Sequence, residues 1–496
     1  MSFLFLLVLT LACLPDNWQS LTWGPLAANG TLSTALTWTA MLTMVAVAVR
    51  MAQRTRSDLR LRPAAAEAIL DRYRRWRHYH LLLLIGVYAV SLTLFGWAWT
   101  MQSIGPADPS GLAQMVPGAE VLLLAPFFAA LVTSWACFYD ADRAFHDSGA
   151  VGSPFWTRGA YIGFHIRQNL GLVAAPVGLL ILQKALKRLF AAYQNEWTFL
   201  FGVVGLLVCA FIGLPWVLRF VLRLRPLPEG DLRRRLLKAG QRHRFACSNI
   251  MEWNTHGAVA NAMVVGIVPW IRYVILTDRL IADLTPDELE AVFGHEMGHI
   301  KHRHMIYYLG FLLISLAVVA GLYELGSKYL PLQGSSALIS EDVAAIPLVG
   351  LVGAYIFVVF GFLSRRCERQ ADLYGCRTVS CAGAECGGHD AGTECFAGGK
   401  GICPTGIQTF INALEKVARL NGISRSRPGW LHSWQHWTIA RRVDFLESVR
   451  SQPLEERRFQ RRVGLVKVAV LAGLCAALVL LAKLHEWDWS RMFGLF

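Results

Sequence analysis

The sequence predicts a mainly α-helical, polytopic membrane protein that carries one smaller α+β domain with a short β-sheet. Composition is the first reason: 54% of the 496 residues are hydrophobic and 17% are charged, with a mean hydropathy of +0.40. Such a chain has more apolar surface than a water-facing globule can bury. The second reason is that long apolar runs recur along the chain. The third is that polar residues gather between those runs, mainly in residues 219–304 and 364–462.

About seven to eight transmembrane helices are expected, because each crossing of the bilayer needs roughly 20 mostly apolar residues. The run that contains Pro176 is short and is a poor match to this length. An apolar stretch at Ser2–Leu14 lacks the basic n-region of a signal peptide, so we interpret it as a short membrane or interfacial segment. The candidate spans are Ser33–Val49, His80–Trp99, Val121–Tyr139, Leu170–Gln183, Trp197–Val217, Met305–Leu325, Ile346–Leu363 and Val463–Lys483.

The residues between the apolar runs predict the orientation of the chain. The loop Arg50–Arg77 is rich in arginine, whereas Met101–Glu120 contains neither Lys nor Arg. Cytoplasmic loops carry the excess of basic residues, so the first loop is expected in the cytoplasm and the second outside. The alternation then brings both polar segments to the cytoplasmic side. We expect an integral membrane protein of the bacterial inner (plasma) membrane whose polar domain faces the cytoplasm.

The same basic loops explain the net charge of +14, which comes from 48 Lys and Arg against 34 Asp and Glu. Basic runs beside apolar segments are attracted to anionic lipid. No nucleic-acid recognition motif accompanies them, so the lipid bilayer is the expected partner and nucleic acid is not. The oligomeric state is not specified by any pattern in the sequence.

Three regions follow from this arrangement. Residues 1–218 form an N-terminal transmembrane region of about five spans, residues 219–450 hold the polar domain, and residues 451–496 form a basic linker and a last transmembrane helix. The polar domain is interrupted by a transmembrane hairpin at about residues 305–363 and by a Cys- and Gly-rich insert at residues 376–406.

The polar domain contains two strand signals followed by a helix signal. Gly257–Val265 and Trp270–Thr277 are apolar and β-branched, which predicts a hairpin or two adjacent strands. Thr285 is placed as an N-cap, with Pro286 at the first helical position and Glu288 completing a capping box. No helix breaker follows for many residues, so this helix is expected to continue directly into the next transmembrane span.

The residues most indicative of chemistry lie on this helix, in the sequence His295-Glu296-Met297-Gly298-His299. Two histidines four positions apart project from one helix face and can share a zinc ion. Glu296 is placed to take a proton from a metal-activated water without binding the metal itself. The alternative interpretation is two core histidines and a glutamate in an ion pair.

A catalytic zinc needs a third protein ligand, and the next candidate follows the seventh apolar run. Glu368 and Asp372 are four positions apart on a helical pattern, so both can face the zinc site. We expect Glu368 to be the third ligand and Asp372 to hold the other ring nitrogen of a ligand histidine. The alternative is a solvated helix close to the membrane, with Arg–Glu pairs.

With these motifs in place, the chain resembles the HtpX-like and CAAX-prenyl-protease-like integral-membrane zinc metalloproteases. The resemblance covers roughly Asn261–Leu446 and includes the strand with Asn261, Ala262, Val264 and Gly266, the segment LTPDELEAVFGHEMGHIKHRH, and the S-R-x-x-E-x-x-A-D segment. It implies a zincin-type α+β metalloprotease domain with the HExxH…E ligand set: His295, His299 and Glu368 as zinc ligands and Glu296 as the catalytic acid and base.

The resemblance also implies a group that contacts the substrate. His436 and Arg442 would touch the substrate backbone or the developing oxyanion, where charge grows in the transition state. The chain departs from the family pattern here, since Trp437 stands where proline is usual and His432 competes with His436.

The strand at Asn261 and Ala262 resembles the edge strand on which an extended peptide binds. An ordinary sheet strand is the alternative interpretation of this segment.

Further histidines and cysteines offer more metal ligands. His302 and His304 follow the helix, and we interpret them as polar residues at the membrane interface, because the zinc shell is already filled. Six residues of the insert could bind a second, structural zinc; free thiols in a flexible loop are the alternative, since a reducing cytoplasm disfavours disulfides. These residues are Cys376, Cys381, Cys386, His389, Cys395 and Cys403.

The expected function is therefore a membrane-embedded zinc metalloendopeptidase that cleaves membrane-associated or misfolded polypeptides, in membrane protein quality control or processing. One alternative is processing of specific peptides in the manner of the CAAX prenyl proteases. The others are a non-catalytic scaffold and a transporter with a metal site. Transport paths need ionisable residues within the spans, and these spans are nearly free of them.

Overall fold

The structure is a computed structural model, and the described residues form two compact units. One unit comprises the chain up to Leu224 with the first residues of the helix that begins at Glu341, and the other comprises the remainder. The structure describes residues 29–103, 118–148, 155–171, 205, 212–329, 341–380, 402–425, 437–452 and 454–484.

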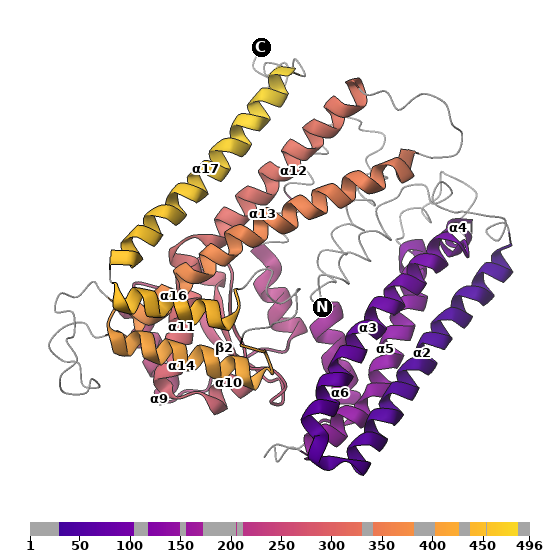
Figure 1. The fold of residues 1–496 in the computed structure, drawn as a ribbon, viewed down its shortest axis with the longest axis horizontal. Coiled ribbons are helices and arrows are strands. Elements are labelled where there is room, and N and C mark those ends of the chain that lie inside the picture. The colour runs from indigo at the N-terminus through magenta and orange to yellow at the C-terminus, as the bar shows by residue number, and fades with distance from the viewer. Residues whose placement is uncertain are drawn as a thin grey trace. The chain divides into compact units, whose positions relative to one another are not determined.

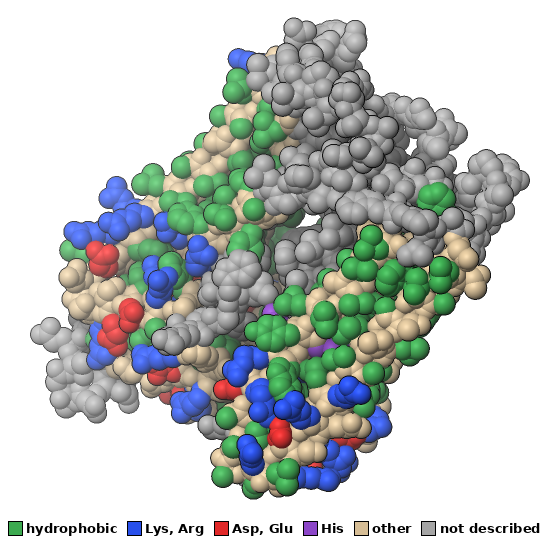
Figure 2. All heavy atoms as spheres, turned by 45° about the vertical axis from the view of Figure 1, so that its right-hand side comes forward, with side chains coloured by type: hydrophobic (Ala, Val, Ile, Leu, Met, Phe, Trp, Pro, Cys, Tyr) green, Lys and Arg blue, Asp and Glu red, His purple; other side chains and the backbone are tan. Residues whose placement is uncertain are grey.

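The first unit is built from long helices that lie side by side (Figure 1). Its main helices are α2 (Gly30–Leu61), α3 (Ala66–Thr93) and α5 (Gly118–Ser148). They enclose a core of apolar side chains that includes Met41, Tyr88 and Phe127, each almost completely buried. Hydrophobic side chains also cover the outer sides of the helices, and Lys and Arg side chains gather at one end (Figure 2). This distribution is typical of helices that meet lipid along their length and water at their ends.

The second unit contains a four-stranded sheet in the order β1-β2-β4-β3. Its strands are β1 (Arg225–Pro226), β2 (Asn249–Trp253), β3 (Ala262–Val265) and β4 (Tyr273–Thr277). The predicted pairing of the segments now called β3 and β4 is confirmed, since they are antiparallel with Val264 opposite Val274. β3 is shorter than predicted and lies at the edge of the sheet, whereas β2, which pairs in parallel with β4, was not predicted.

Eight helices accompany the sheet among the described residues of the second unit. They are α9 (Asp231–Arg242), α10 (Asp278–Asp283), α11 (Pro286–Lys301), α12 (His304–Tyr329), α13 (Glu341–Thr378), α14 (Pro404–Leu420), α16 (Ile439–Ser451) and α17 (Leu454–Leu484). The predicted capping box of α11 is present: Thr285 Oγ1 accepts from the Glu288 backbone, and the Glu288 carboxylate accepts from the Thr285 backbone at 2.8 Å. α13 is one continuous helix from its apolar half to Thr378, so Glu368 and Asp372 lie on the same rod.

Two predicted continuous helices are interrupted. The prediction that the HEMGH helix continues into the next span is wrong, because α11 ends at Lys301 and α12 begins at His304. Arg303 between them has a φ of 53°, in the left-handed region that ends a helix. The predicted span His80–Trp99 is likewise broken, since α3 ends at Thr93 and Gly96 has a φ of 72°.

Three of the described helical segments are long and apolar enough to cross a membrane: Gly30–Leu61, Leu122–Asp147 and Leu454–Lys483. Shorter apolar helices are Ile212–Val221 and His304–Ser315. Most of the predicted spans Leu170–Gln183 and Trp197–Val217 lie outside the described residues. The observed architecture is the predicted one, mainly α-helical with apolar helices and a small sheet.

Candidate active site and metal centre

The two histidines of α11 face each other across one turn of the helix. Their Nε2 atoms are 3.3 Å apart. Glu368 on α13 completes the group, with one carboxylate oxygen 3.8 Å from His295 Nε2 and the other 3.6 Å from His299 Nε2. His295, His299 and Glu368 form a cluster of potential metal ligands whose donor atoms all lie within 4.8 Å of one another.

This geometry fits a zinc ion. Nitrogen ligands about 2.0–2.1 Å from a tetrahedral zinc lie about 3.3 Å from each other, which matches the separation of the two Nε2 atoms. Two imidazoles and one carboxylate are also the donor set of hydrolytic zinc centres that keep a fourth position for water. The Glu368 side chain is only 7% exposed, and a buried carboxylate that faces two imidazoles needs a cation to offset its charge.

Glycine contacts bring α11 close enough to α13 for these ligands to meet. A Cβ atom added to Gly298 would lie 2.9 Å from the Cα atom of Ala371 and 2.9 Å from the Cβ atom of Tyr374. One added to Gly294 would lie 2.6 Å from the Cβ atom of Thr378. The two helices therefore pack with almost no side chain between them, which sets the distance between the histidines and Glu368.

Asp372 lies on the far side of His295, at the position expected for an orienting carboxylate. Its Oδ1 atom is 3.0 Å from His295 Nδ1, a close contact in which the N–H bond is not well aligned with the oxygen. Burial lowers the pKa of His295, but the negative charges of Asp372, Glu368 and Glu296 outweigh it, so the pKa lies above its usual value. A proton held at Nδ1 by Asp372 leaves Nε2 with its lone pair toward Glu368.

The expected contact of Arg442 with substrate stays a prediction, and the structure places this side chain against Asp372. It is buried, and its Nε atom donates to Asp372 Oδ2 at 2.9 Å while a second guanidinium nitrogen bonds Oδ1. Burial alone would raise the pKa of Asp372, but Arg442 and His295 together hold it below its usual value. Arg442 thus keeps Asp372 ionised and fixed beside His295.

A second chain of contacts orients His299, and the sequence did not predict it. His304 was expected at the membrane interface, but it is fully buried and its Nδ1 atom lies 3.0 Å from His299 Nδ1. Its Nε2 atom is 3.1 Å from the side-chain oxygen of Gln370, which also accepts from the Lys467 ammonium at 2.9 Å. The turn at Arg303 reverses the chain enough to bring His304 back to the site, and no pattern in the sequence marks that turn.

The direction of these hydrogen bonds follows from the chemistry of the groups. The ammonium of Lys467 only donates, so the oxygen of Gln370 is an acceptor and His304 Nε2 must carry the proton. A neutral His304 then has a bare Nδ1, which accepts from His299 Nδ1–H. His299 Nε2 is left unprotonated, facing His295 and Glu368, as a metal ligand must be.

Glu296 points toward the edge strand of the sheet. Its Oε2 atom accepts a hydrogen bond from the backbone N–H of Val264 at 3.0 Å. Asn261 C=O accepts from Thr277 N–H at 3.0 Å, so the Asn261–Thr277 pair is hydrogen-bonded. Because such pairs alternate along an antiparallel ladder, the backbone groups of Ala262 and Val264 face the open edge, while those of Asn261 face β4.

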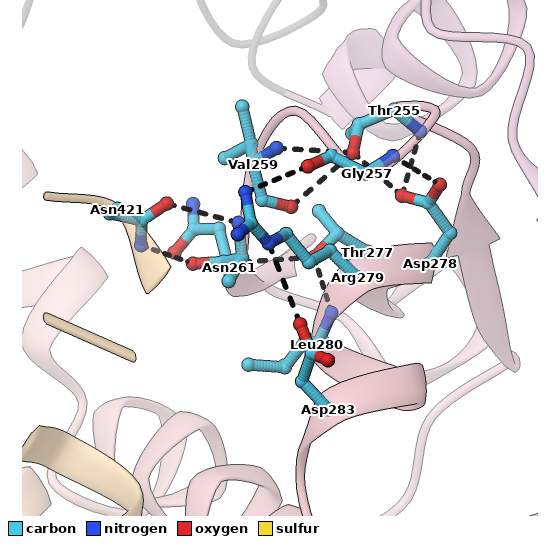
Figure 3. A network of polar contacts seen from close by, with 11 residues as sticks. Thr255, Gly257, Val259, Asn261, Thr277, Asp278, Arg279, Leu280, Asp283 and Asn421 are labelled. Atoms are coloured by element: carbon cyan, nitrogen blue, oxygen red, sulfur yellow. Dashed lines mark hydrogen bonds and ion pairs between the residues drawn. The ribbon is translucent and has the colours of Figure 1, made fainter. Parts of the chain in front are cut away.

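The loop before β3 is held by side chains from two other elements (Figure 3). The Asp278 carboxylate accepts from the backbone N–H groups of Thr255 and Gly257 at 2.9 and 2.8 Å. The Asn421 side chain, at the end of α14, accepts from the N–H of Ala260 at 3.0 Å and donates to its C=O at 2.7 Å. These contacts fix the start of the strand that Glu296 touches.

Several predicted site residues are placed elsewhere or lie outside the described residues. His436 and its competitor His432 lie outside them, as do Cys381, Cys386, His389 and Cys395. The described residue Trp437 packs against the guanidinium groups of Arg365, Arg369 and Arg441, with guanidinium carbons 4.7–5.3 Å from its ring centroid.

The two described cysteines of the predicted insert do not lie in a loop. Cys376 is buried within α13, and Cys403 is the N-cap of α14, where its sulfur accepts from Gly406 N–H at 3.3 Å. Burial raises the pKa of the Cys376 thiol well above its usual value, which disfavours the thiolate that a metal would bind. The insert therefore begins and ends inside the predicted bounds of 376–406.

Three features in combination are typical of a zincin-type membrane metalloprotease. They are the helix pair, the edge strand, and the cluster of two histidines and one glutamate. Residues 226–393 match the model of Peptidase family M48. The match takes in α11, the apolar hairpin and the part of α13 with Glu368.

Relatives with protease names align over parts of the chain. A protease HtpX homolog of Methanocaldococcus jannaschii is 25% identical over 42% of this chain and 66% of its own length. A CAAX prenyl protease 1 homolog of Arabidopsis thaliana is 25% identical over 61% of this chain and 73% of its own. An uncharacterized metalloprotease, YhfN of Bacillus subtilis, is 32% identical over 30% of this chain, and this chain spans 37% of its length.

The crystal structure of S. mikatae Ste24p has the same fold. It matches 83% of this chain and 98% of its own, with a TM-score of 0.52 and 14% sequence identity. The similarity extends well beyond the M48 domain into the helices that precede it.

Proposed function

We propose that the protein is a zinc-dependent endopeptidase of the membrane, with His295, His299 and Glu368 as ligands and Glu296 as the catalytic acid and base. The observation that carries the proposal is the convergence of three metal-donor atoms beside a glutamate that touches a sheet edge. When bound, zinc supplies Lewis acidity toward a peptide carbonyl and lowers the pKa of water. The M48 domain and the protease names of the relatives support this assignment.

Glu296 moves the protons in this mechanism. Its carboxylate takes a proton from the attacking water and delivers it to the amide nitrogen of the leaving group, as a general base and then a general acid. The hydrogen bond from Val264 N–H keeps the carboxylate on the side of the helix that faces the sheet edge. Asp372 and Arg442 hold His295, and His304 and Gln370 hold His299, so both ligand rings keep their orientation through the reaction.

The substrate would bind as an extended polypeptide along β3. The backbone of Ala262 faces the open edge and can pair with an added strand, whereas Asn261 contributes by holding β3 to β4. A peptide laid along this edge would run past Glu296, because Glu296 contacts the same edge at Val264.

The substrates we propose are membrane-associated or misfolded polypeptides, cleaved at the cytoplasmic face of a bacterial inner membrane. A second candidate is processing of prenylated peptides, favoured by the match to the CAAX prenyl protease 1 homolog, which covers 61% of this chain. Incubating the purified protein with an unfolded soluble protein and with a farnesylated CAAX peptide separates the two, since each candidate predicts preferential cleavage of a different substrate.

The mechanism is tested by Glu296→Gln, which removes the proton acceptor and keeps the shape. We expect metal content to stay near that of the wild type while cleavage of the preferred substrate falls by about 10²–10⁴-fold. Asp287→Asn is the matched control, because Asp287 is an exposed carboxylate on the same helix, and it should leave turnover unchanged. Full turnover by the Glu296→Gln protein would exclude Glu296 as the catalytic acid and base.

A further inference from the structure

A groove on the first unit lies between α2 and α3, and none of the residues assigned to peptide cleavage lines it. It encloses about 370 Å³ and combines two arginines with aromatic and aliphatic side chains. Its lining residues are Val47, Arg50, Met51, Arg54, Trp76, Tyr79, His80 and Leu83.

The lining residues form one stripe on each helix. Those of α2 are at positions 47, 50, 51 and 54, and those of α3 are at positions 76, 79, 80 and 83. Both sets have the spacing i, i+3, i+4, i+7, which places side chains on a single helix face. The groove is therefore built from two facing helix stripes.

The two stripes run in opposite directions. Arg72 pairs with Asp58, and His80 Nε2 lies 3.0 Å from the carbonyl oxygen of Met44, so rising positions on α3 meet falling positions on α2. The polar end of the α2 stripe consequently lies beside the aromatic start of the α3 stripe. The aliphatic ends, at positions 47 and 83, lie together at the other end of the groove.

Two arginines at the polar end have no ion-pair partner among the residues that the structure describes. The Arg54 guanidinium carbon is 5.5 Å from the Trp76 ring centroid, and the Arg72 guanidinium covers the same ring at 5.1 Å. Arg72 has its own counter-charge in Asp58. Among the residues that the structure describes, neither Arg50 nor Arg54 has a carboxylate within ion-pair distance.

The remaining lining matches the boundary between water and lipid. α2 is long and apolar enough to cross a membrane, and Arg50 follows directly on its most apolar stretch. Tyr79 and Leu83 are 61% and 52% exposed along the groove. Tyr and Trp favour the head-group level of a bilayer, and arginine forms bidentate hydrogen bonds with phosphate.

We propose that this groove binds an anionic phospholipid, with its phosphate on Arg50 and Arg54 and an acyl chain against Val47, Met51 and Leu83. Two uncompensated guanidinium groups favour a lipid with a net negative charge over a zwitterionic one. The aliphatic end of the groove favours a lipid over free phosphate, because it offers apolar surface to a chain.

The test is binding of phosphatidylglycerol to the full-length protein in detergent, followed by native mass spectrometry, with phosphatidylcholine and inorganic phosphate as separate arms. We expect a clear preference for phosphatidylglycerol that inorganic phosphate at equal concentration does not displace. Arg50→Gln combined with Arg54→Gln should weaken phosphatidylglycerol binding by about thirtyfold. Each near-surface arginine contributes a factor of about five to six to the binding of anionic lipid, and the two factors multiply.

The matched control is Arg56→Gln combined with Arg60→Gln, which removes the same charge from exposed positions of α2 outside the groove. It should leave phosphatidylglycerol binding within about twofold of the wild type. An equal loss in both double variants would reduce the effect to general membrane charge and overturn the proposal. Tight binding of inorganic phosphate alone would also overturn it. Arg50→Lys with Arg54→Lys, which keeps the charge, should retain the preference for phosphatidylglycerol and so exclude misfolding as the cause of a loss.

Discussion

At the scale of the residue, the two histidines that we propose as metal ligands are held by chemically different partners. His295 faces the Asp372 carboxylate, which Arg442 keeps ionised, whereas His299 faces the neutral ring of His304. A carboxylate behind an imidazole raises the basicity of the ring more than a neutral acceptor does. The two halves of the centre should therefore respond differently to substitution.

Asp372→Asn should lower zinc affinity by about 10–100-fold, measured by competition with a chelator, because the charge that supports His295 is lost. The variant also leaves the buried Arg442 guanidinium without its ion pair, which costs about 3–5 kcal/mol of folding stability. Combining it with Arg442→Leu should restore much of the stability but not the zinc affinity. Asp444→Asn, an exposed carboxylate on α16, is the control. Full recovery of zinc affinity in the double variant would contradict a role for Asp372 in supporting His295.

The residues of the site were predictable to different degrees for a physical reason. His295, His299, Glu368 and Asp372 lie at four-residue spacings within single helices, and helical geometry alone puts each pair on one face. His304 belongs to the site only because the chain turns at Arg303, a non-glycine residue in a left-handed conformation. Sequence gives little warning of such a turn, so the chain of contacts behind His299 was missed.

At the scale of the element, the contact between α11 and α13 sets the geometry of the centre. The helices approach at Gly294 and Gly298, where Thr378 and Ala371 occupy the space that a side chain would need. The opposing atoms at Gly298 include backbone, which cannot rotate away. The position of Glu368 relative to the histidines therefore depends on the absence of a side chain at both glycines.

Gly298→Ala should push the helices apart, lowering folding stability by about 1–3 kcal/mol and reducing bound zinc. Thermal unfolding and metal analysis of the purified protein measure the two effects. Gly310→Ala on α12 is the matched control, since a Cβ atom there meets nothing within 4 Å and alanine favours a helix. Equal melting temperatures and zinc contents for the two variants would rule out close packing as the control on the site.

The elements themselves were predictable where local signals are strong. The capping box indicated the start of α11, and apolar and β-branched residues indicated β3 and β4. β2 escaped prediction because Asn249–Trp253 mixes polar and apolar residues and gains its strand conformation from pairing with β4. The end of α3 was not predicted because Gly96 lies within an otherwise apolar run.

At the scale of the whole molecule, composition and the recurring apolar runs predicted a mainly α-helical membrane protein, and two strand signals predicted the small sheet; the architecture agrees with both. The arrangement of the helices was not predictable, because apolar runs specify that a helix is buried or in lipid without specifying its neighbours. The same limit explains why the sequence indicated basic loops but not the groove that Arg50 and Arg54 line.

The stability of the metal-free protein should depend on pH through the buried pair at the centre. The pKa of Asp372 is lowered from 3.8, so its contribution to stability is present above about pH 4 and is lost as the pH falls through the folded value. The pKa of His295 is raised from 6.5, so its contribution is present below that value and is lost as the pH rises through the folded value. The melting temperature measured in the presence of a chelator should therefore be highest between these two limits. In Asp372→Asn the fall in melting temperature at acid pH should disappear.

The continuity of α13 has a consequence for the biogenesis of the enzyme. His295 and His299 emerge from the ribosome before the apolar hairpin, and Glu368 follows only after it, on the helix that contains the second half of that hairpin. A nascent chain that ends within the hairpin has two of these metal donors instead of three. Completion of the donor set thus waits until synthesis has passed the whole hairpin and reached Glu368, and no chain shorter than this can assemble the three-donor cluster.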